Sequence, residues 1–416
     1  MKIRPRARVA VLILPLVACG ETVSASRARD ATTEPGGTGG AGGARDVPLD
    51  AGGGSLSPAD LGGTTTGADA ALARAPDATE LAEPDAEAPA PDGAVDPPPG
   101  PDGAVEPPPA PGCPEPVLDE VSEWRHRFVS PATVSLGVPQ HSAVEPIVNP
   151  GTPLAVAGKF AYGAISKDLE DENVELFVRL PGAGVCGDWR SVGVATTDSD
   201  GRASVVVDAA LVPESGHYDF RLVVQGDHTD ARGALWVVEP GTAFVVFDVD
   251  GTLTIGDSEL FEQVLLGQEP EMYEAADVIA HTYFEAGYQP LYMTGRPYFL
   301  NPSTRRWLID RGFPPGPVRT TDEVGQALPT EGGVQTYKRE YLLGILEGAG
   351  AEIPYAYGNA TTDICAYAQA GIDPANTFII GPNAGGACDG FAATRAVADY
   401  PSHLPSLANL PPAPAP

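Results

Sequence analysis

Basic residues are scarce in this chain of 416 residues, which has 25 lysines and arginines against 56 aspartates and glutamates. The formal net charge is −31. Nucleic acids and anionic lipid surfaces are bound through clustered Lys and Arg, so this balance argues against nucleic-acid binding and against a polybasic lipid contact. It does not exclude a local site for a phosphate group.

Apolar runs long enough to cross a membrane are also lacking. The run Val9–Ala18 is too short to span a bilayer, and it follows a cationic start that contains four basic residues. A cationic start followed by a short apolar run is typical of an export signal. We therefore predict a signal peptide over residues 1–19.

Residues Leu16, Val17, Ala18 and Cys19 resemble the lipobox of bacterial lipoproteins. The resemblance implies cleavage before Cys19 and acylation of its sulfur, and Gly20 in the next position implies sorting to the outer membrane. We therefore expect an exported lipoprotein that is anchored to a membrane, in the periplasm or at the cell surface. A plain secretory signal is the alternative.

Aromatic residues are almost absent from residues 20–112, which are dominated by Gly, Ala, Pro, Asp and Thr. Within this segment, "PDGAVDPPPGPDGAVEPPPAP" repeats a ten-residue unit from Pro91 to Pro111. Such a composition cannot bury enough apolar surface to offset the conformational entropy of the chain. The segment is predicted to be a disordered linker.

Short alternating runs characterise residues 113–239, with no helical run of useful length. Turn clusters separate them, and the pattern predicts an all-β, immunoglobulin-like sandwich of antiparallel strands. Asp198 and Asp200 could suggest a calcium site, but the further ligands of such a loop are missing and a hairpin turn is favoured. The runs are "VELFVRL", "RASVVVD", "YDFRLVVQG" and "ALWVV".

Strand-like and helix-like segments alternate over residues 240–400, which predicts an α/β domain with a parallel, doubly wound sheet. Its ligand site should lie at the carboxyl ends of the strands. Residues 401–416 are predicted to be a Pro-rich tail. The strand-like runs are "FVVFD", "PLYM", "PVRTT", "YAYG" and "TFIIG", and the helical segments fall near 259–286, 302–311, 336–348 and 362–370.

Cysteines number only five, and one of them, Cys19, is assigned to the lipid anchor. The other four allow three pairings, and export from the cytoplasm permits disulfides. We expect Cys113 to pair with Cys186 and Cys365 to pair with Cys388. Buried free thiols are the alternative.

Two aspartates follow a buried strand in "FVVFDVDGTLT", and three further motifs come after them in order. The motifs are "YMTGRP", "QTYKREYL" and "YGNATTD". This ordered set resembles the haloacid-dehalogenase superfamily of phosphatases over about residues 242–395. The resemblance implies a Rossmann-like fold that uses Mg²⁺.

The resemblance also implies a role for each polar residue. Asp248 would attack phosphorus, and Asp250 would protonate the leaving oxygen and then activate water. Mg²⁺ would be held by Asp248, the carbonyl of Asp250 and Asp363. Thr294 would donate a hydrogen bond to a phosphoryl oxygen, and Lys338 would balance its negative charge.

Gly295, Arg296 and Asn359 are expected to contact the substrate. Each polar residue also has an ordinary structural explanation. Asn359 could cap a helix, Lys338 and Arg296 could lie on the surface, and Thr294 could bond to the backbone at a strand end. Because four motifs occur in the expected order, the functional interpretation is favoured for the set.

A narrower resemblance covers both folded regions. "VVQGDHTDARGALWV" and "YGNATTDICAYAQAGIDPANTFIIG" are similar to the carboxy-terminal half of the membrane-associated phosphatidylinositol transfer proteins, the retinal-degeneration-B class, which contains a lipin-type domain. The resemblance implies affinity for phosphatidic acid or related headgroups. The lipid-transfer domain of that class has no counterpart in residues 20–112. Transfer-protein relatives typically lack the first aspartate, whereas this chain has Asp248 and, like the lipins, Asn359.

The leading hypothesis is a Mg²⁺-dependent phosphatase that acts on a phospholipid such as phosphatidic acid. The intervals between the motifs leave no room for a large cap domain, which suits a bulky or membrane-borne substrate. Two alternatives stay open: a non-catalytic module that binds phosphatidic acid or phosphoinositide, and an exported phosphatase of soluble phosphomonoesters. The absence of a P-loop argues against a kinase. The oligomeric state cannot be inferred.

Overall fold

The computed structural model describes residues 113–163, 166–182, 186–256, 270–323, 326 and 331–416. The predicted signal peptide, the lipidation site at Cys19 and the linker 20–112 lie outside these residues. The described residues belong to one compact unit, Pro101–Pro416. Across them, we find no helix with the length and apolar character needed to span a bilayer.

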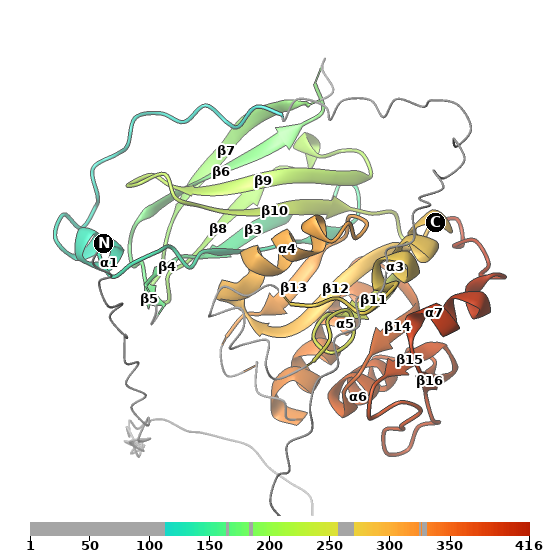
Figure 1. Ribbon diagram of the computed structural model, residues 1–416. Coiled ribbons are helices and arrows are strands. Elements are labelled where there is room, and N and C mark those ends of the chain that lie inside the picture. Colours follow the sequence, from blue (N-terminus) through green and yellow to red (C-terminus); the bar gives the residue numbers. More distant parts are fainter. Residues whose placement is uncertain (1–112, 164–165, 183–185, 257–269, 324–325, 327–330) are drawn as a thin grey trace, which may run out of the picture. The chain divides into compact units, whose positions relative to one another are not determined.

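The first half of this unit is a β-sandwich (Figure 1). One sheet has the order β1-β3-β8 and the other has the order β2-β10-β9-β6-β7, with antiparallel neighbours except for the parallel pair β2 and β10. The strands are β1 (Ser142–Val144), β2 (Ile147–Val148), β3 (Leu154–Lys159), β6 (Asn173–Leu180), β7 (Asp188–Thr196), β8 (Arg202–Val207), β9 (Gly216–Val224) and β10 (Asp230–Val237). Smaller elements are α1 (Val129–Val134), the hairpin β4 (Ala161–Tyr162) and β5 (Lys167–Asp168), and η1 (Ala209–Leu211).

The predicted sandwich is confirmed, and the core lies between its two sheets. Leu176, Val207 and Leu235 are all fully buried there. Strand β7 had no sequence signal because it lies at the edge of its sheet, where none of its residues is fully buried. An edge strand without fully buried residues shows no clear alternation of polar and apolar residues.

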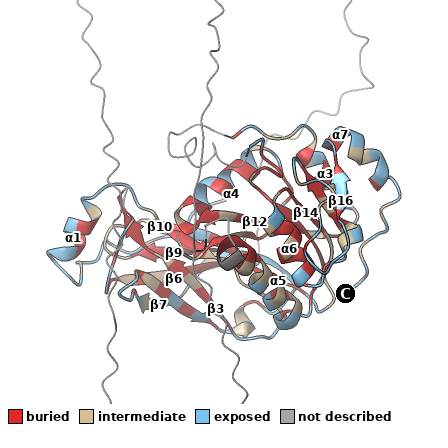
Figure 2. Cartoon of the chain, turned by 90° about the horizontal axis from the view of Figure 1, so that it is seen from below, coloured by how far each residue is buried: buried red, intermediate tan, exposed pale blue. Residues whose placement is uncertain are grey.

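The second half is an α/β domain, and its six-stranded sheet has the order β13-β12-β11-β14-β15-β16. All neighbouring strands are parallel, so the predicted parallel sheet is confirmed. The central strand β11 is buried at every position, as expected for a sheet covered on both faces. Its neighbour β12, which is labelled in Figure 2, is also buried over most of its length. The strands are β11 (Ala243–Asp248), β12 (Gln289–Pro297), β13 (Val318–Thr321), β14 (Glu352–Gly358), β15 (Thr377–Ile380) and β16 (Arg395–Val397).

Three helices lie within one residue of the predicted ranges: α4 (Asn301–Asp310), α5 (Thr336–Gly348) and α6 (Thr361–Gln369). The structure departs from the helix predicted over 259–286. Residues 257–269 lie outside the described residues, and α3 spans Ala276–Glu285.

The six residues before α3 are not helical, because they pair with the loop that follows β11. Met272 forms an antiparallel bridge with Thr254, and the backbone N–H of Tyr273 donates to the carbonyl of Leu253. Ala275 then takes a left-handed conformation, with φ of 63°, before the helix begins. Hydrophobic spacing alone could not reveal this pairing, because it depends on a distant part of the chain.

The carboxy-terminal segment packs on the α/β domain through α7 (Tyr400–His403) and η6 (Leu404–Leu407). Leu407 is buried in the core, and the backbone N–H of Ala413 donates to the carbonyl of Ala286 over 2.7 Å. Strand β16 also lacked a sequence signal, since it has three residues and two of them are exposed. The folded domain therefore includes most of the segment that composition describes as a tail.

Buried Glu145 connects the sandwich with the α/β domain. Its Oε1 accepts a hydrogen bond from the backbone N–H of Ala234 at 2.6 Å and forms an ion pair with Arg305 at 2.5 Å. Its Oε2 accepts from the backbone N–H of Val318 at 2.7 Å. One carboxylate thus contacts β10, α4 and β13, and a buried charge with this many partners is costly to displace.

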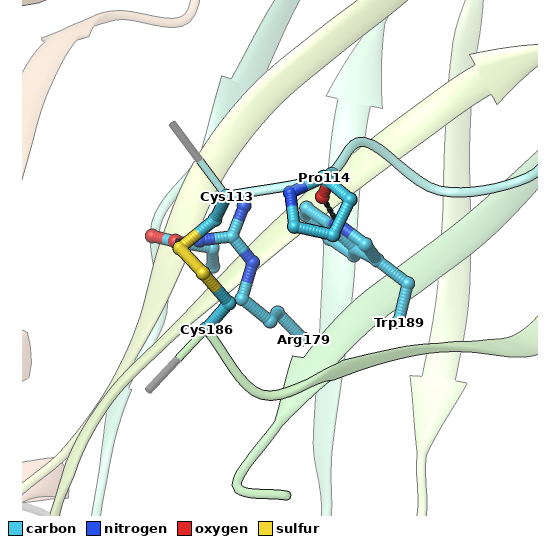
Figure 3. Close-up of a disulfide and its surroundings, with 6 residues drawn as sticks. Cys113, Pro114, Arg179, Cys186 and Trp189 are labelled. Atoms are coloured by element: carbon cyan, nitrogen blue, oxygen red, sulfur yellow. Dashed lines mark hydrogen bonds and ion pairs between the residues drawn. A yellow bond between two sulfur atoms is a disulfide. The ribbon is translucent and has the colours of Figure 1, made fainter. Parts of the chain in front are cut away.

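Two disulfides are present in the structure, Cys113–Cys186 and Cys365–Cys388. Figure 3 shows the first, which joins the segment before the sandwich to the residues preceding β7. The indole N–H of Trp189 donates to the carbonyl of Pro114 over 2.9 Å beside it.

We expect the double variant Cys113→Ala, Cys186→Ala to lower the free energy of unfolding of the sandwich by about 2–4 kcal/mol, because the cross-link closes a long loop in the unfolded chain. Urea denaturation followed by tryptophan fluorescence measures the loss. The matched control is Cys365→Ala, Cys388→Ala, which opens a separation of 23 residues instead of 73. An equal or larger loss in the control would contradict the loop-length argument.

Candidate active site

The paired aspartates lie at the carboxyl end of the central strand. Asp248 is the last residue of β11 and is 3% exposed. The chain turns at Gly251, whose φ of 72° favours glycine. This turn lets Thr252 Oγ1 donate a hydrogen bond to Asp248 Oδ2 over 2.8 Å. One oxygen of the Asp248 carboxylate is thereby fixed by its own loop.

The other oxygen of Asp248 is held by a lysine from α5. Lys338, which is 1% exposed, donates from Nζ to Asp248 Oδ1 and to Asp363 Oδ1, the latter over 2.6 Å. Asp363 lies in the first turn of α6, where its Oδ2 accepts from the backbone N–H groups of Asn359 and Ala360, at 3.1 Å each. A carboxylate is favoured in this position because helix N-termini carry partial positive charge. Two buried carboxylates therefore share one ammonium group.

A second set of contacts surrounds Asp250. Thr294 Oγ1 donates to Asp250 Oδ2 over 2.6 Å, and Arg296 contacts Oδ1 through Nη2 at 2.7 Å and through Nε at 2.9 Å. Arg296 is itself positioned by α4, where Thr304 Oγ1 accepts from Nη1 over 2.8 Å. The strand end of β12 and the start of α4 thus hold the second aspartate in place.

In the cluster around Asp248, two carboxylates face one ammonium group, that of Lys338. Burial, followed by the negative charge of Asp363, raises the pKa of Asp248, although Lys338 acts in the opposite direction. Burial alone would lower the pKa of Lys338, but Asp248 and Asp363 raise it well above its ordinary value. Lys338 is therefore charged at neutral pH, and the negative charge around it is incompletely compensated.

The donor chemistry of this cluster fits Mg²⁺, which prefers carboxylate and carbonyl oxygens. Three carboxylates, Asp248, Asp250 and Asp363, lie around two cationic side chains. No group of three or more Asp, Glu, His or Cys side chains in the described part of the chain is arranged to hold a metal ion. Lys338 lies between two of the carboxylates here and would share them with a bound cation.

The two remaining residues expected at the site, Gly295 and Asn359, make contacts that serve the fold. Asn359 is 4% exposed, and its carbonyl accepts from the side chain of Asn383 over 2.8 Å. Gly295 is required by packing, since a Cβ there would lie 2.9 Å from a methyl carbon of Val334. The structure thus gives Gly295 and Asn359 structural contacts, whereas it gathers Asp248, Asp250, Thr294, Arg296, Lys338 and Asp363 into two adjacent clusters.

Three further residues support the site but are not among the predicted site residues. Thr252 belongs to the "DGTLT" motif, so its contact with Asp248 could have been inferred from its spacing. Thr304 and Tyr400 had no such signal. The hydroxyl of Tyr400 donates to the carbonyl of Thr252 over 2.8 Å from a position 148 residues away in the sequence.

A parallel α/β sheet with two aspartates at the end of its central strand, a lysine on a following helix and an aspartate after a later strand is a haloacid-dehalogenase-like domain. Comparison with known families specifies the class further. Residues 139–237 match the PITM 1-3 beta-sandwich domain, and residues 245–381 match the PITM 1-3 LNS2 domain. The folded part of the chain belongs to this family.

The chain is similar to membrane-associated phosphatidylinositol transfer protein 1 of Rattus norvegicus, with 32% identity over 58% of this chain and 18% of that protein. Its identity to the protein retinal degeneration B of Drosophila melanogaster is 30%, over 61% of this chain and 20% of that protein. The human transfer protein 3 is 29% identical over 58% of this chain and 23% of its own length. The chain thus spans about a fifth of these curated relatives.

Proposed function

We propose that the chain is a Mg²⁺-dependent phosphatase that forms an aspartyl-phosphate on Asp248 and acts on the phosphate monoester of a phospholipid such as phosphatidic acid. The observation that carries this proposal is the buried cluster in which Lys338 holds both Asp248 and Asp363 at the carboxyl end of β11. Ligands of open α/β sheets bind at this edge.

The contacts of Asp248 suit a nucleophile. Thr252 and Lys338 each hold one carboxylate oxygen, so the side chain has a defined orientation toward phosphorus. A carboxylate oxygen of Asp248 forms the new bond to phosphorus as the bond to the ester oxygen breaks. Asp250 gives the leaving oxygen its proton.

Hydrolysis of the intermediate reverses the role of Asp250. As a carboxylate it takes a proton from water, whose oxygen attacks phosphorus and releases Asp248 together with inorganic phosphate. Arg296 and Thr294 donate hydrogen bonds to this carboxylate in the structure. A phosphoryl group would accept hydrogen bonds from the same two side chains. Lys338 compensates the charge on the transferring group.

Mg²⁺ would be held by Asp248, the main-chain carbonyl of Asp250 and Asp363, and would supply charge compensation for the phosphoryl oxygens. Removal of the cation is therefore expected to abolish phosphate release. Asp363 would remain in place in its absence, because the backbone N–H groups of Asn359 and Ala360 bind its other oxygen.

A phospholipid substrate is supported by the relatives and by the predicted anchor. The relatives are named for phosphatidylinositol transfer and membrane association. Acylation at Cys19 would confine the domain near headgroups and raise their effective concentration. Transfer activity is not proposed, because the chain covers about a fifth of those proteins.

A phosphate-release panel tests the proposal. Full-length protein is compared on phosphatidylcholine vesicles that contain phosphatidic acid and on p-nitrophenyl phosphate, each with Mg²⁺ or with EDTA. We expect release that requires Mg²⁺ and is faster on the vesicles. Faster release from the soluble ester would instead favour an exported phosphatase of soluble phosphomonoesters.

A non-catalytic phospholipid-binding module is the second candidate, and the ion pair between Arg296 and Asp250 favours it. A general acid that is engaged by a guanidinium through two nitrogen atoms is not free to meet a leaving group. This candidate predicts vesicle binding without phosphate release from any ester in the panel.

A further inference from the structure

Five arginines line one cavity of about 530 Å³, although the whole chain has only 25 basic residues against 56 acidic ones. The cavity lies where β6, β7, β9 and β10 of the sandwich meet α4, which Figure 1 shows beside β10. None of these arginines belongs to the clusters around Asp248 and Asp250. The five are Arg179, Arg221, Arg232, Arg305 and Arg306.

Two of these guanidinium groups already hold a single carboxylate. Arg221 Nη1 lies 2.6 Å from Glu115 Oε2, and Arg232 Nη1 lies 3.1 Å from Glu115 Oε1. Both arginines also contact Asp230. Each oxygen of the Glu115 carboxylate is thus bound by a different guanidinium group, and guanidinium groups form the same charge-assisted hydrogen bonds with phosphate oxygens.

One guanidinium donor at this point has no hydrogen-bond partner among the described residues. Arg221 is 8% exposed, and its Nε has no hydrogen-bond partner among the described residues. Burial, and then the adjacent charge of Arg232, lowers the pKa of Arg221. A buried donor without a partner is costly, so an additional anionic acceptor would stabilise this side of the cavity.

Helix α4 and the edge of the sandwich extend the basic lining. Arg306 is exposed and forms no ion pair with any residue that the structure describes, whereas Arg305 next to it is paired with Glu145. Across the cavity, Arg179 pairs with Asp219 at 2.9 Å and stacks over Trp189 (Figure 3). A ligand would therefore meet a free guanidinium on one side and an aromatic surface on the other.

Glu115 enters the cavity from the amino-terminal lead-in segment and not from the sandwich core. Its side chain is 55% exposed, and its segment is held by the Cys113–Cys186 disulfide and by the hydrogen bond between Trp189 and the carbonyl of Pro114. An ion pair with a half-exposed partner contributes little stability. A dianionic group could therefore replace this carboxylate at low cost.

We propose that this cavity is a second anion site, separate from Asp248, that binds a phosphate monoester, and that Glu115 occupies the position of the ligand's phosphate. A phosphate monoester carries more charge and more acceptor oxygens than a carboxylate, so it can engage Arg221, Arg232 and Arg306 together. Lipid headgroups and soluble phosphate share this chemistry. Binding here does not depend on turnover at Asp248.

Variants with opposite expected effects test the proposal. In the full chain with EDTA, Arg232→Gln combined with Arg306→Gln should bind inorganic phosphate about tenfold more weakly, because two charge-assisted contacts are lost. Glu115→Gln should bind it about five- to tenfold more tightly, because the competing charge is removed. Calorimetry measures both. The control is Arg190→Gln, an exposed arginine on β7 that does not line the cavity.

Vesicle flotation with the same variants distinguishes the ligand source. Phosphatidylcholine vesicles with and without phosphatidic acid are used beside the phosphate titration. If the expected changes occur in both assays, the cavity recognises the phosphate group itself. Changes confined to the vesicles indicate a lipid headgroup as the ligand, and changes confined to the phosphate titration indicate a soluble ligand. Wild-type affinities in every variant, or weaker binding together with a lower melting temperature in Glu115→Gln, would overturn the proposal.

Discussion

Asp248→Asn is expected to reduce phosphate release by at least about 10⁴-fold, because the amide cannot form the aspartyl-phosphate. The fold should survive. Asn has nearly the same size, it can still accept the hydrogen bond of Thr252, and Asp363 remains as the partner of Lys338. The variant removes a buried carboxylate whose pKa is raised by burial, so neutralising it relieves a desolvation cost.

Phosphate release from phosphatidic acid vesicles and from p-nitrophenyl phosphate, together with the melting temperature, checks this expectation. Asp310→Asn is the matched control, because Asp310 is an exposed residue at the end of α4. Turnover of Asp248→Asn close to that of the control would show that Asp248 is not the nucleophile. No release from the parent protein, combined with vesicle binding in both variants, would favour the non-catalytic module.

Lys338→Met should cost about 3–5 kcal/mol of folding free energy at neutral pH, because Asp248 and Asp363 lose the only cation that both contact in the described structure. The loss should be smaller at pH 5 than at pH 7.5. Burial and the charge of Asp363 already raise the pKa of Asp248, and removal of Lys338 raises it further. A carboxyl group whose pKa is raised in the folded state contributes stability that is lost as the pH rises from its unfolded-state pKa to its folded-state pKa.

Urea denaturation at the two pH values measures this effect. Arg339→Met is the control, since the side chain of the neighbouring arginine is 33% exposed and contacts Glu340 at 3.3 Å. The double variant Lys338→Met, Asp248→Asn should recover part of the loss because one carboxylate no longer requires a partner. A pH-independent loss equal to that of Arg339→Met would contradict a buried charge cluster.

Most of the fold could be predicted from local patterns. The alternation around Val205 and Val207 in β8, and the continuous apolar run from Phe244 to Phe247 in β11, distinguish a sandwich strand from a central parallel strand. Strand β7 and the segment Glu271–Ala275 could not be predicted, because an exposed edge strand lacks periodicity and an irregular segment depends on its partner.

The local motif is enough to predict that Asp248 and Asp250 lie at a strand end, because a motif after a buried strand is a local feature. The position of Lys338 between Asp248 and Asp363, and the contact of Arg296 with Asp250, follow from the tertiary fold. The tertiary fold also brings five arginines together around one cavity in an acidic chain. Such contacts join residues far apart in sequence, and they depend on strand order and helix packing, which no short stretch of sequence encodes.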